Sequence, residues 1–267
     1  MKELYIRGVS GLLYVALILA AIFFNPLFFT LIILLFSSLA IVELQRLISH
    51  KSYLPIAIVY LFVYNFYQSK INTPDLLYPL VSVFIAHLFL VYWLFSKKTI
   101  PLGYLTKTFI ALFYLGLGCF FIIAIAGNAE RFQSKDILLF FILIWTNNSF
   151  AYLVGKQWGK KTLFSRISPK KSWEGFIGGL FLTLVTVVIY QEFYPQKSMP
   201  YYIFLGTMTT LLATLGDLIE SKFKRNAKVK DSGSLLPGHG GFFDRMDSAI
   251  FTAPWFYFII NFNEYVS

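Results

Sequence analysis

Nine apolar runs constrain the fold of this chain more than any other feature of its sequence. They cover roughly residues 8–24, 27–46, 54–68, 77–95, 105–127, 137–155, 173–191, 201–219 and 248–263. A helix needs about 20 mostly apolar residues to cross a bilayer core, where every backbone polar group must be hydrogen-bonded within the protein. The short alternating segments typical of a membrane barrel are absent from this sequence. The pattern therefore predicts an all-α, polytopic integral membrane protein with about nine transmembrane helices.

The composition leaves little room for a separate soluble domain. Of the 267 residues, 57% are hydrophobic and only 13% are charged, which is unlike the composition of soluble globular domains. The first run ends at Asn25-Pro26 without a small-residue cleavage site, so we interpret it as a retained helix. The single cysteine, Cys119, excludes an intramolecular disulfide and a thiolate zinc cluster. We divide the chain into N-terminal transmembrane helices, residues 1–135 with about five spans, and a C-terminal catalytic region, residues 136–267.

Lys and Arg residues are distributed unequally between the two sides that nine spans would create. One side receives 19 of the 23 basic residues and the other receives 4. Because cytoplasmic loops of membrane proteins are enriched in Lys and Arg, we expect a cytoplasmic N-terminus in the cell (inner) membrane. The two large basic loops, residues 155–175 and 217–247, then face the cytoplasm together.

Two pairs of acidic residues flank the second basic loop. Asp217 and Glu220 are spaced i,i+3 at the end of the eighth run. Asp244 and Asp247 repeat this spacing at the start of the ninth. Residues three apart share a helix face, and the loop returns to the same side of the membrane, so the four carboxylates can converge. Carboxylates in this position are costly unless they are paired or bind a cation, and oxygen ligands without Cys or clustered His favour Mg²⁺.

The same loops carry positive charge and glycines that suit phosphate groups. Lys170 and Lys171 precede Ser172, the predicted N-cap of the seventh run, and helix N-termini bind anions. Glycines between the acidic pairs allow the backbone to approach an anion closely. These features predict phosphoryl or nucleotidyl transfer to an anionic, membrane-embedded lipid. The second loop contains the basic residues Lys222, Lys224, Arg225, Lys228, Lys230 and Arg245 and the glycines Gly233, Gly238, Gly240 and Gly241.

Three stretches of the C-terminal region carry a specific pattern: "ISPKKSWEG" at Ile167–Gly175, "GDLIES" at Gly216–Ser221 and "SKFKRNAKVKDSGSLLPGHGGFFDRMD" at Ser221–Asp247. Together they resemble the signature of the phosphatidate cytidylyltransferases, or CDP-diacylglycerol synthases. The resemblance covers residues 145–250, whereas the first five spans match in hydropathy only. It implies that CTP and phosphatidate are converted to CDP-diacylglycerol and pyrophosphate at the cytoplasmic face, with Mg²⁺ and a monovalent cation such as K⁺. We expect membrane lipids around the chain and no nucleic-acid partner, and we leave a homodimer open.

The resemblance also implies roles for individual residues. Asp217, Asp244 and Asp247 would form the metal centre, and we expect these three aspartates, with Lys224 and Arg245 beside them, to be catalytic. The implied substrate-binding residues are Asn148, Ser168, Lys170, Lys171, Trp173, Glu174, Lys222, Arg225, Lys230, Asp231, His239, Gly240 and Gly241.

The sixth run departs from the family pattern. Members of the family usually carry W-x-x-D-[ST]-x-A-Y there, whereas this chain has "WTNNSFAY" at Trp145–Tyr152, with Asn148 in place of the aspartate. An amide oxygen can still coordinate Mg²⁺ or accept a hydrogen bond from a ribose hydroxyl, but it carries no charge.

Two alternative functions are consistent with the same residues. The chain could transfer a nucleotidyl or phosphoryl group from CTP to another membrane lipid, because contacts with a lipid tail are generic apolar surface. A transporter of anionic lipids belongs to a different class of protein, and most of the predicted spans lack the ionisable residues that a conduction path requires. CTP-dependent release of pyrophosphate would distinguish an enzyme from a transporter.

Overall fold

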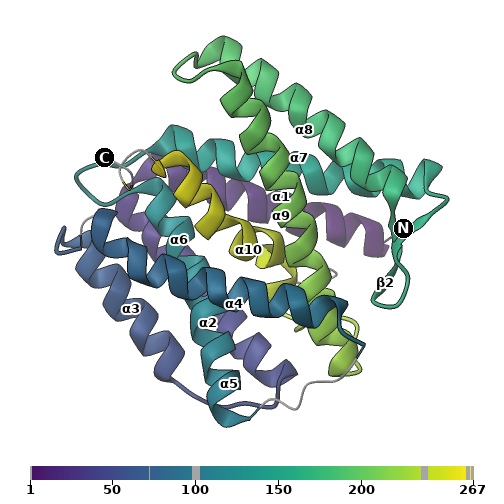
Figure 1. Ribbon diagram of the computed structural model, residues 1–267, viewed down its shortest axis with the longest axis horizontal. Coiled ribbons are helices and arrows are strands. Elements are labelled where there is room, and N and C mark those ends of the chain that lie inside the picture. Colours follow the sequence, from purple (N-terminus) through teal and green to yellow (C-terminus); the bar gives the residue numbers. More distant parts are fainter. Residues whose placement is uncertain (1, 72, 98–102, 236–239, 263–264, 266–267) are drawn as a thin grey trace.

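The computed structural model describes residues 2–71, 73–97, 103–235, 240–262 and 265, and these residues are almost entirely helical (Figure 1). The helices are α1 (Lys2–Phe24), α2 (Pro26–Leu47), α3 (Leu54–Tyr67), α4 (Leu77–Phe95), α5 (Tyr104–Phe109), α6 (Leu117–Ala126), α7 (Ser134–Trp158), α8 (Trp173–Phe193), α9 (Met199–Asn226) and α10 (Phe243–Ile260). A 3-10 turn at Thr73–Leu76 precedes α4, and a π-helical segment at Ile110–Gly116 joins α5 to α6. The predicted all-α class is confirmed.

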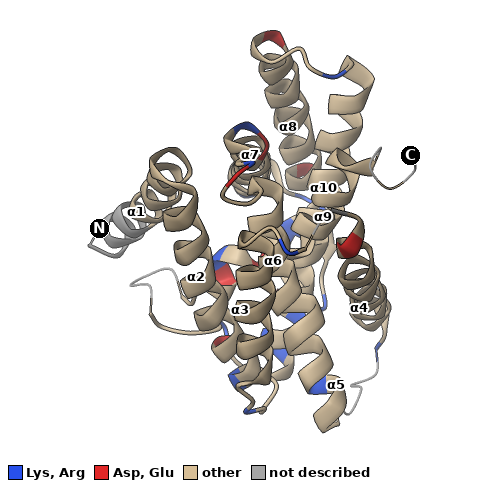
Figure 2. Cartoon of the chain, turned by 90° about the vertical axis from the view of Figure 1, so that its left-hand side faces the viewer, with Lys and Arg blue, Asp and Glu red and all other residues tan. Residues whose placement is uncertain are grey.

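Each of the nine apolar runs falls mainly on one helical segment. Within the described ranges, six segments are long and apolar enough to cross a membrane: Pro26–Leu47, Pro74–Phe95, Tyr104–Ala126, Ser134–Trp158, Trp173–Phe193 and Met199–Asn226. Gly11–Phe24 and α3 are apolar but shorter. The structure therefore confirms membrane-compatible helices, but it does not confirm a count of nine spans. Charged residues lie mainly at helix ends and in loops (Figure 2).

Helix α6 lies in the core of the molecule. Every residue of α6 is buried, and both α2 and α10 pack against this helix (Figure 1). The packing against α10 is close, because a Cβ atom on Gly118 would lie 2.8 Å from the carbonyl oxygen of Ile250. The N-terminal and C-terminal regions of the chain thus contribute to one hydrophobic core.

Helices α7 and α8 run side by side (Figure 1). Gly175 and Gly179 of α8 form a G-x-x-x-G motif, which favours close packing of membrane helices. A Cβ atom on Gly175 would lie 2.6 Å from the carbonyl oxygen of Ala151, and one on Gly179 would lie 2.9 Å from that of Asn147. The backbones of α8 and α7 therefore lie so close together at these two positions that only glycine fits.

A short antiparallel hairpin connects α7 to α8. It consists of β1 (Thr162–Phe164) and β2 (Ser168–Ser172), with Thr162 opposite Ser172. Ser172 is the N-cap of α8, as predicted, and its Oγ accepts a hydrogen bond from the Gly175 amide at 3.1 Å. In the hairpin turn, Arg166 donates to the carbonyl oxygen of Ser96 beyond the end of α4 at 2.9 Å. These contacts fix the hairpin at both ends.

Candidate functional site

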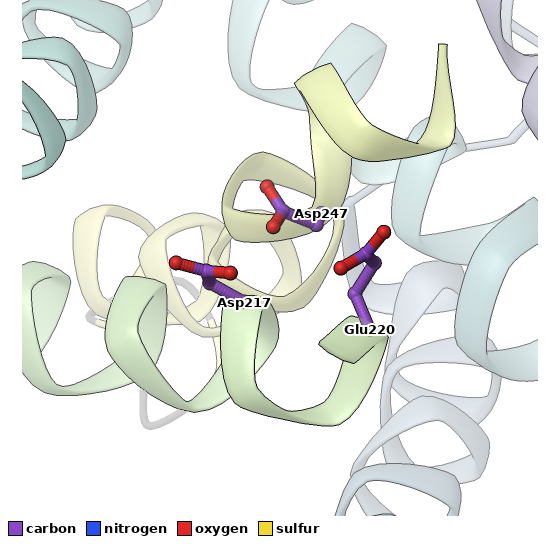
Figure 3. A group of neighbouring side chains, drawn as sticks. All are labelled: Asp217, Glu220 and Asp247. Carbon is purple, nitrogen blue, oxygen red and sulfur yellow. The ribbon is translucent and has the colours of Figure 1, made fainter. Parts of the chain in front are cut away.

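Three carboxylates from two helices meet at one point. Asp217 and Glu220 lie on α9 and Asp247 lies on α10, and one carboxylate oxygen of each residue is within 4.8 Å of the others. Figure 3 shows the three side chains turned toward one another. Glu220 and Asp247 are buried and Asp217 is half-buried. Gly216 permits this approach of the two helices, because a Cβ atom there would lie 2.7 Å from the Asp247 carbonyl oxygen.

This three-acid group (Asp217, Glu220 and Asp247) fits a hard divalent cation. Magnesium binds oxygen ligands at about 2.1 Å in octahedral geometry, so opposite ligands are about 4 Å apart, close to the upper limit of the separations within the group. Three carboxylates this close together repel one another unless positive charge offsets them. The three carboxylates are therefore residues that could hold a hard divalent cation.

Two lysines lie against the three-acid group. The Nζ atom of Lys171, on β2, forms an ion pair with Asp217 on α9. The Nζ atom of Lys224 lies 2.8 Å from Glu220 Oε1 and 2.6 Å from Asp244 Oδ1. Both residues were predicted to contact phosphates, and the structure places both ammonium groups directly beside the acids.

Asp244 was predicted as a metal ligand, but the structure places it beside the three-acid group and gives it other partners. Its Oδ2 atom accepts hydrogen bonds from the amides of Ser232 and Gly241, both at 2.8 Å, and from Ser232 Oγ at 2.9 Å. Its Oδ1 atom pairs with Lys224 Nζ at 2.6 Å, so positive charge and hydrogen-bond donors offset the charge of both carboxylate oxygens. Asp244 is thus a charged anchor for both ends of the loop, and Glu220 completes the three-acid group.

The glycines of the loop approach carboxylates of the chain itself. Gly240 has a φ of +81°, and a Cβ atom there would lie 2.5 Å from Asp244 Oδ2. A φ in this range is strained for any residue with a side chain. The glycines were predicted to let the backbone approach a bound anion, and in this structure the backbone approaches the carboxylates of Asp244 and of a second acid, Glu43.

Sequence reasoning missed Glu43, which belongs to α2. Only 1% of this residue is exposed. Its carboxylate accepts hydrogen bonds from Ser232 Oγ at 2.9 Å and from the amides of Phe242 at 3.2 Å and Phe243 at 2.9 Å. A signal was present, because Glu43 is the one acidic residue of the run 27–46, and ionisable residues in membrane spans usually have a specific role.

Lys222 was predicted to bind substrate, but it is engaged in a contact with α4. Its Nζ atom lies 4.4 Å from the centre of the Trp93 ring. It also donates to the carbonyl oxygens of Trp93 and Ser96, the latter at 3.1 Å. These carbonyl oxygens lie at and just beyond the last turn of α4, so the charge of Lys222 is used within the fold.

Arg225 and Glu174 also make contacts within the chain. Arg225 Nε donates to the carbonyl oxygen of Ile167, in the hairpin turn, at 3.3 Å. Glu174 Oε2 accepts hydrogen bonds from the amides of Lys160 at 3.0 Å and Lys161 at 3.2 Å. Both side chains hold the segment between α7 and α8 in place.

The remaining predicted residues lie in or beside the two loops. Trp173 is 49% exposed at the start of α8 and makes an edge contact with Phe176. His239 lies outside the described residues. Ser168 is half-buried, and Lys170, Lys230, Asp231 and Arg245 are exposed.

Asn148, the departure in the sixth run, lies on α7 beside the start of α10. Its Nδ2 atom donates to Ser248 Oγ at 3.1 Å, and its Oδ1 atom accepts from Asn147 Nδ2 at 3.1 Å. Ser248 directly follows Asp247 in the sequence. The Asn148 side chain therefore contacts the residue next to a member of the three-acid group.

Comparison with known proteins gives a consistent result. Residues 5–263 match the model of the cytidylyltransferase family. The chain is 33% identical to the phosphatidate cytidylyltransferase of Bacillus subtilis (strain 168) over 97% of this chain and 98% of that protein. It is 43% identical to the protein of the same name from Staphylococcus aureus (strain COL) over 53% of each chain. The protein of that name from Haemophilus influenzae is also 43% identical, over 46% of each chain.

Proposed function

The chain belongs to the cytidylyltransferase family, and from this premise we propose that it transfers CMP from CTP to phosphatidate in phospholipid biosynthesis. The products are CDP-diacylglycerol and pyrophosphate. The observation that carries the proposal is the three-acid group with Lys171 and Lys224 against it, at the ends of apolar helices. Carboxylates for a metal ion and ammonium groups for phosphates are the chemistry that a nucleotidyl transfer to a lipid phosphate requires.

In this proposal Asp217, Glu220 and Asp247 hold Mg²⁺. When bound, the ion supplies positive charge beside the phosphate oxygens. The monovalent cation K⁺ is a second expected cofactor. Asp244 contributes through the loop that it anchors.

The reaction itself needs positioning and charge neutralisation rather than a strong base. A phosphate oxygen of phosphatidate forms a bond to the α-phosphorus of CTP, while the bond from that phosphorus to the bridging oxygen of the β-phosphate breaks. Pyrophosphate leaves with the bonding electron pair. Phosphatidate is already anionic near neutral pH, so Lys171 and Lys224 act by offsetting charge and orienting the two phosphates. The cations Lys170, Lys230 and Arg245 are exposed in or beside the same two loops.

We further propose nine spans, a cytoplasmic N-terminus and a site at the cytoplasmic face of the cell membrane. The support is the division of 19 basic residues against 4 and the presence of a helix at each apolar run. The 14 residues of α3 are only about 21 Å long and the 18 residues of α10 about 27 Å, at about 1.5 Å per residue. These two spans would require a locally thinner bilayer.

A sidedness assay tests the function and the orientation together. We expect labelled CTP, added outside sealed inverted membrane vesicles that contain the chain and phosphatidate, to yield a lipid-soluble cytidine product and pyrophosphate. Sealed right-side-out vesicles should yield product only after permeabilisation, because CTP does not cross the membrane. Vesicles from cells without the chain provide the background.

Each outcome of this assay has one meaning. Product formed without added phosphatidate, when another phospholipid or a polyprenyl phosphate is supplied, would show that this other lipid is the acceptor. Uptake of lipid without pyrophosphate release would indicate a transporter. Equal activity in sealed right-side-out vesicles would contradict the proposed orientation.

Asn148→Asp should fold and should lower the Mg²⁺ concentration needed for half-maximal activity. Asn147 Nδ2 and the Ser248 hydroxyl can both donate to a carboxylate at this position. A nearby negative charge should strengthen cation binding by up to about tenfold, or about 1.4 kcal/mol. The measurement is a Mg²⁺ titration of turnover together with thermal unfolding.

Asn147→Asp is the matched control on the same helix. Asn147 is 2% exposed and its Oδ1 atom has no hydrogen-bond partner within the described part of the chain. A carboxylate at that position would be buried and unpaired, so this variant should unfold at a lower temperature. If Asn148→Asp behaves like Asn147→Asp, Asn148 does not lie near a bound cation.

A further inference from the structure

Glu43 joins two regions that are far apart in the sequence. It lies on α2, in the N-terminal region, and its hydrogen-bond partners Ser232, Phe242 and Phe243 follow about 190 to 200 residues later. Both of its carboxylate oxygens are used, Oε1 by the Phe242 amide and Oε2 by the Phe243 amide and the Ser232 hydroxyl. The side chain therefore contacts both ends of the loop that carries the glycine pattern.

The charge of Glu43 is offset by the N-terminus of α10. Phe243 is the first residue of this helix and Phe242 is its N-cap. The amides at a helix N-terminus lack intrahelical acceptors and carry partial positive charge, so a carboxylate is stabilised there. Glu43 thus caps α10 from another helix, one turn before Asp247.

Two glycines of the loop are required by this contact. A Cβ atom on Gly233 would lie 2.8 Å from Glu43 Cδ, and one on Gly241 would lie 2.5 Å from the same atom. Any larger residue would push the carboxylate away from the loop. Both loop ends are therefore shaped around the Glu43 side chain.

Direct contacts connect Glu43 to the three-acid group. The Ser232 hydroxyl lies 2.9 Å from Glu43 Oε2 and 2.9 Å from Asp244 Oδ2. Asp244 pairs with Lys224, and Lys224 pairs with Glu220. A second, shorter connection runs along α10, from the amides that Glu43 binds to Asp247.

We propose that Glu43 is a positioning residue for the transfer reaction. It fixes the loop ends at 232–233 and 241–243 and the first turn of α10, and so sets the place of Asp247 and Asp244 in the site. The kinetic part of this inference rests on the function proposed above, whereas its structural part does not. The N-terminal helices thereby contribute a side chain of α2 to the arrangement of the site.

Gln45 offers a matched control, because it is another buried polar residue of α2. It is 6% exposed, and its side chain donates to the Ser52 carbonyl oxygen at 2.8 Å and accepts from the Ser52 amide at 3.1 Å. These contacts hold the turn between α2 and α3 and do not involve the loop. A general loss of stability should therefore be common to Glu43→Gln and Gln45→Ala, and a positioning effect should appear in the first alone.

The test combines hydrogen exchange with kinetics on the full-length protein in detergent. Glu43→Gln keeps one acceptor oxygen and places an amide group against a backbone or hydroxyl donor. Amides at 231–235 and 240–246 should then exchange about tenfold faster than in the wild type, as expected after loss of a hydrogen bond to a charged group. Turnover should fall by about tenfold or more, with a higher Mg²⁺ requirement. Gln45→Ala should leave exchange in these segments and the Mg²⁺ requirement unchanged.

Two results would overturn the proposal. One is wild-type exchange and turnover in Glu43→Gln, and the other is an equal effect of Gln45→Ala on both measurements. If Glu43→Gln does not fold, Ser232→Ala carries the test, because it removes only the hydroxyl that joins Glu43 to Asp244. Wild-type exchange at 231–235 in Ser232→Ala would then contradict the proposal that Glu43 fixes this end of the loop. If the wild type shows no CTP-dependent activity, the proposed function fails while the exchange measurement still decides the role of Glu43.

Discussion

Asp217→Asn and Asp247→Asn should each lower turnover by about 100- to 1,000-fold, the usual effect of losing one preorganised electrostatic contact. Each substitution removes one negative charge from the three-acid group while it preserves the size of the side chain. A divalent cation should then bind more weakly, so higher Mg²⁺ should restore part of the activity. Turnover measured across a Mg²⁺ titration checks this, with thermal unfolding measured on the same samples.

Asp136→Asn makes the same chemical change away from the site and therefore serves as the control. Asp136 lies in the first turn of α7, on the opposite side of the membrane from the site in the proposed topology. It should retain wild-type turnover and the wild-type Mg²⁺ requirement. Wild-type turnover of Asp217→Asn at limiting Mg²⁺ would remove Asp217 from the set of metal ligands, and the same holds for Asp247.

Asp244→Asn should reduce both activity and stability, and for a different reason. Lys224 would lose one of its two carboxylate partners, and the ion pair is largely buried, with side chains 13% and 5% exposed. Removing one partner of a buried pair costs about 3 kcal/mol or more of folding free energy. The loop ends would also lose a charged acceptor for the Ser232 and Gly241 amides. We expect a lower unfolding temperature and turnover reduced by about 100-fold.

A double-mutant cycle separates these contributions. Lys224→Met alone leaves Glu220 and Asp244 without their shared cation, whereas Asp244→Asn combined with Lys224→Met removes one of these charges as well. The double variant should therefore be more stable than the sum of the two single effects predicts, with a coupling of about 1 kcal/mol or more. If the effects of the two substitutions on the free energy of unfolding are additive, the Lys224–Asp244 pair contributes little to holding the loop. An Asp244→Asn variant with wild-type stability and strongly altered Mg²⁺ activation would instead support Asp244 as a direct ligand.

The residues of the site could be predicted from the sequence only where their placement depends on residues close to them in the chain. The i,i+3 spacing on α9 places Asp217 and Glu220 on one face, and the short return of the chain through the loop brings α10 and Asp247 to the same level. Ser172 was identifiable as an N-cap because capping depends on neighbouring residues. The partners of Glu43 and of Lys222 were not identifiable, because they are separated from these residues by more than 120 positions in the sequence.

The sequence by itself determined that this chain is a bundle of apolar helices with acids and bases gathered in two loops. The reason is physical, since lipid leaves the backbone no other hydrogen-bonding partners than its own helix. Only the tertiary structure decided which charges meet. The packing of α9 against α10 selected Glu220 for the three-acid group and turned Asp244 toward Lys224 and the loop. The packing of α2 brought Glu43 to the same loop, because contacts between distant helices depend on how whole surfaces fit together and not on any local pattern.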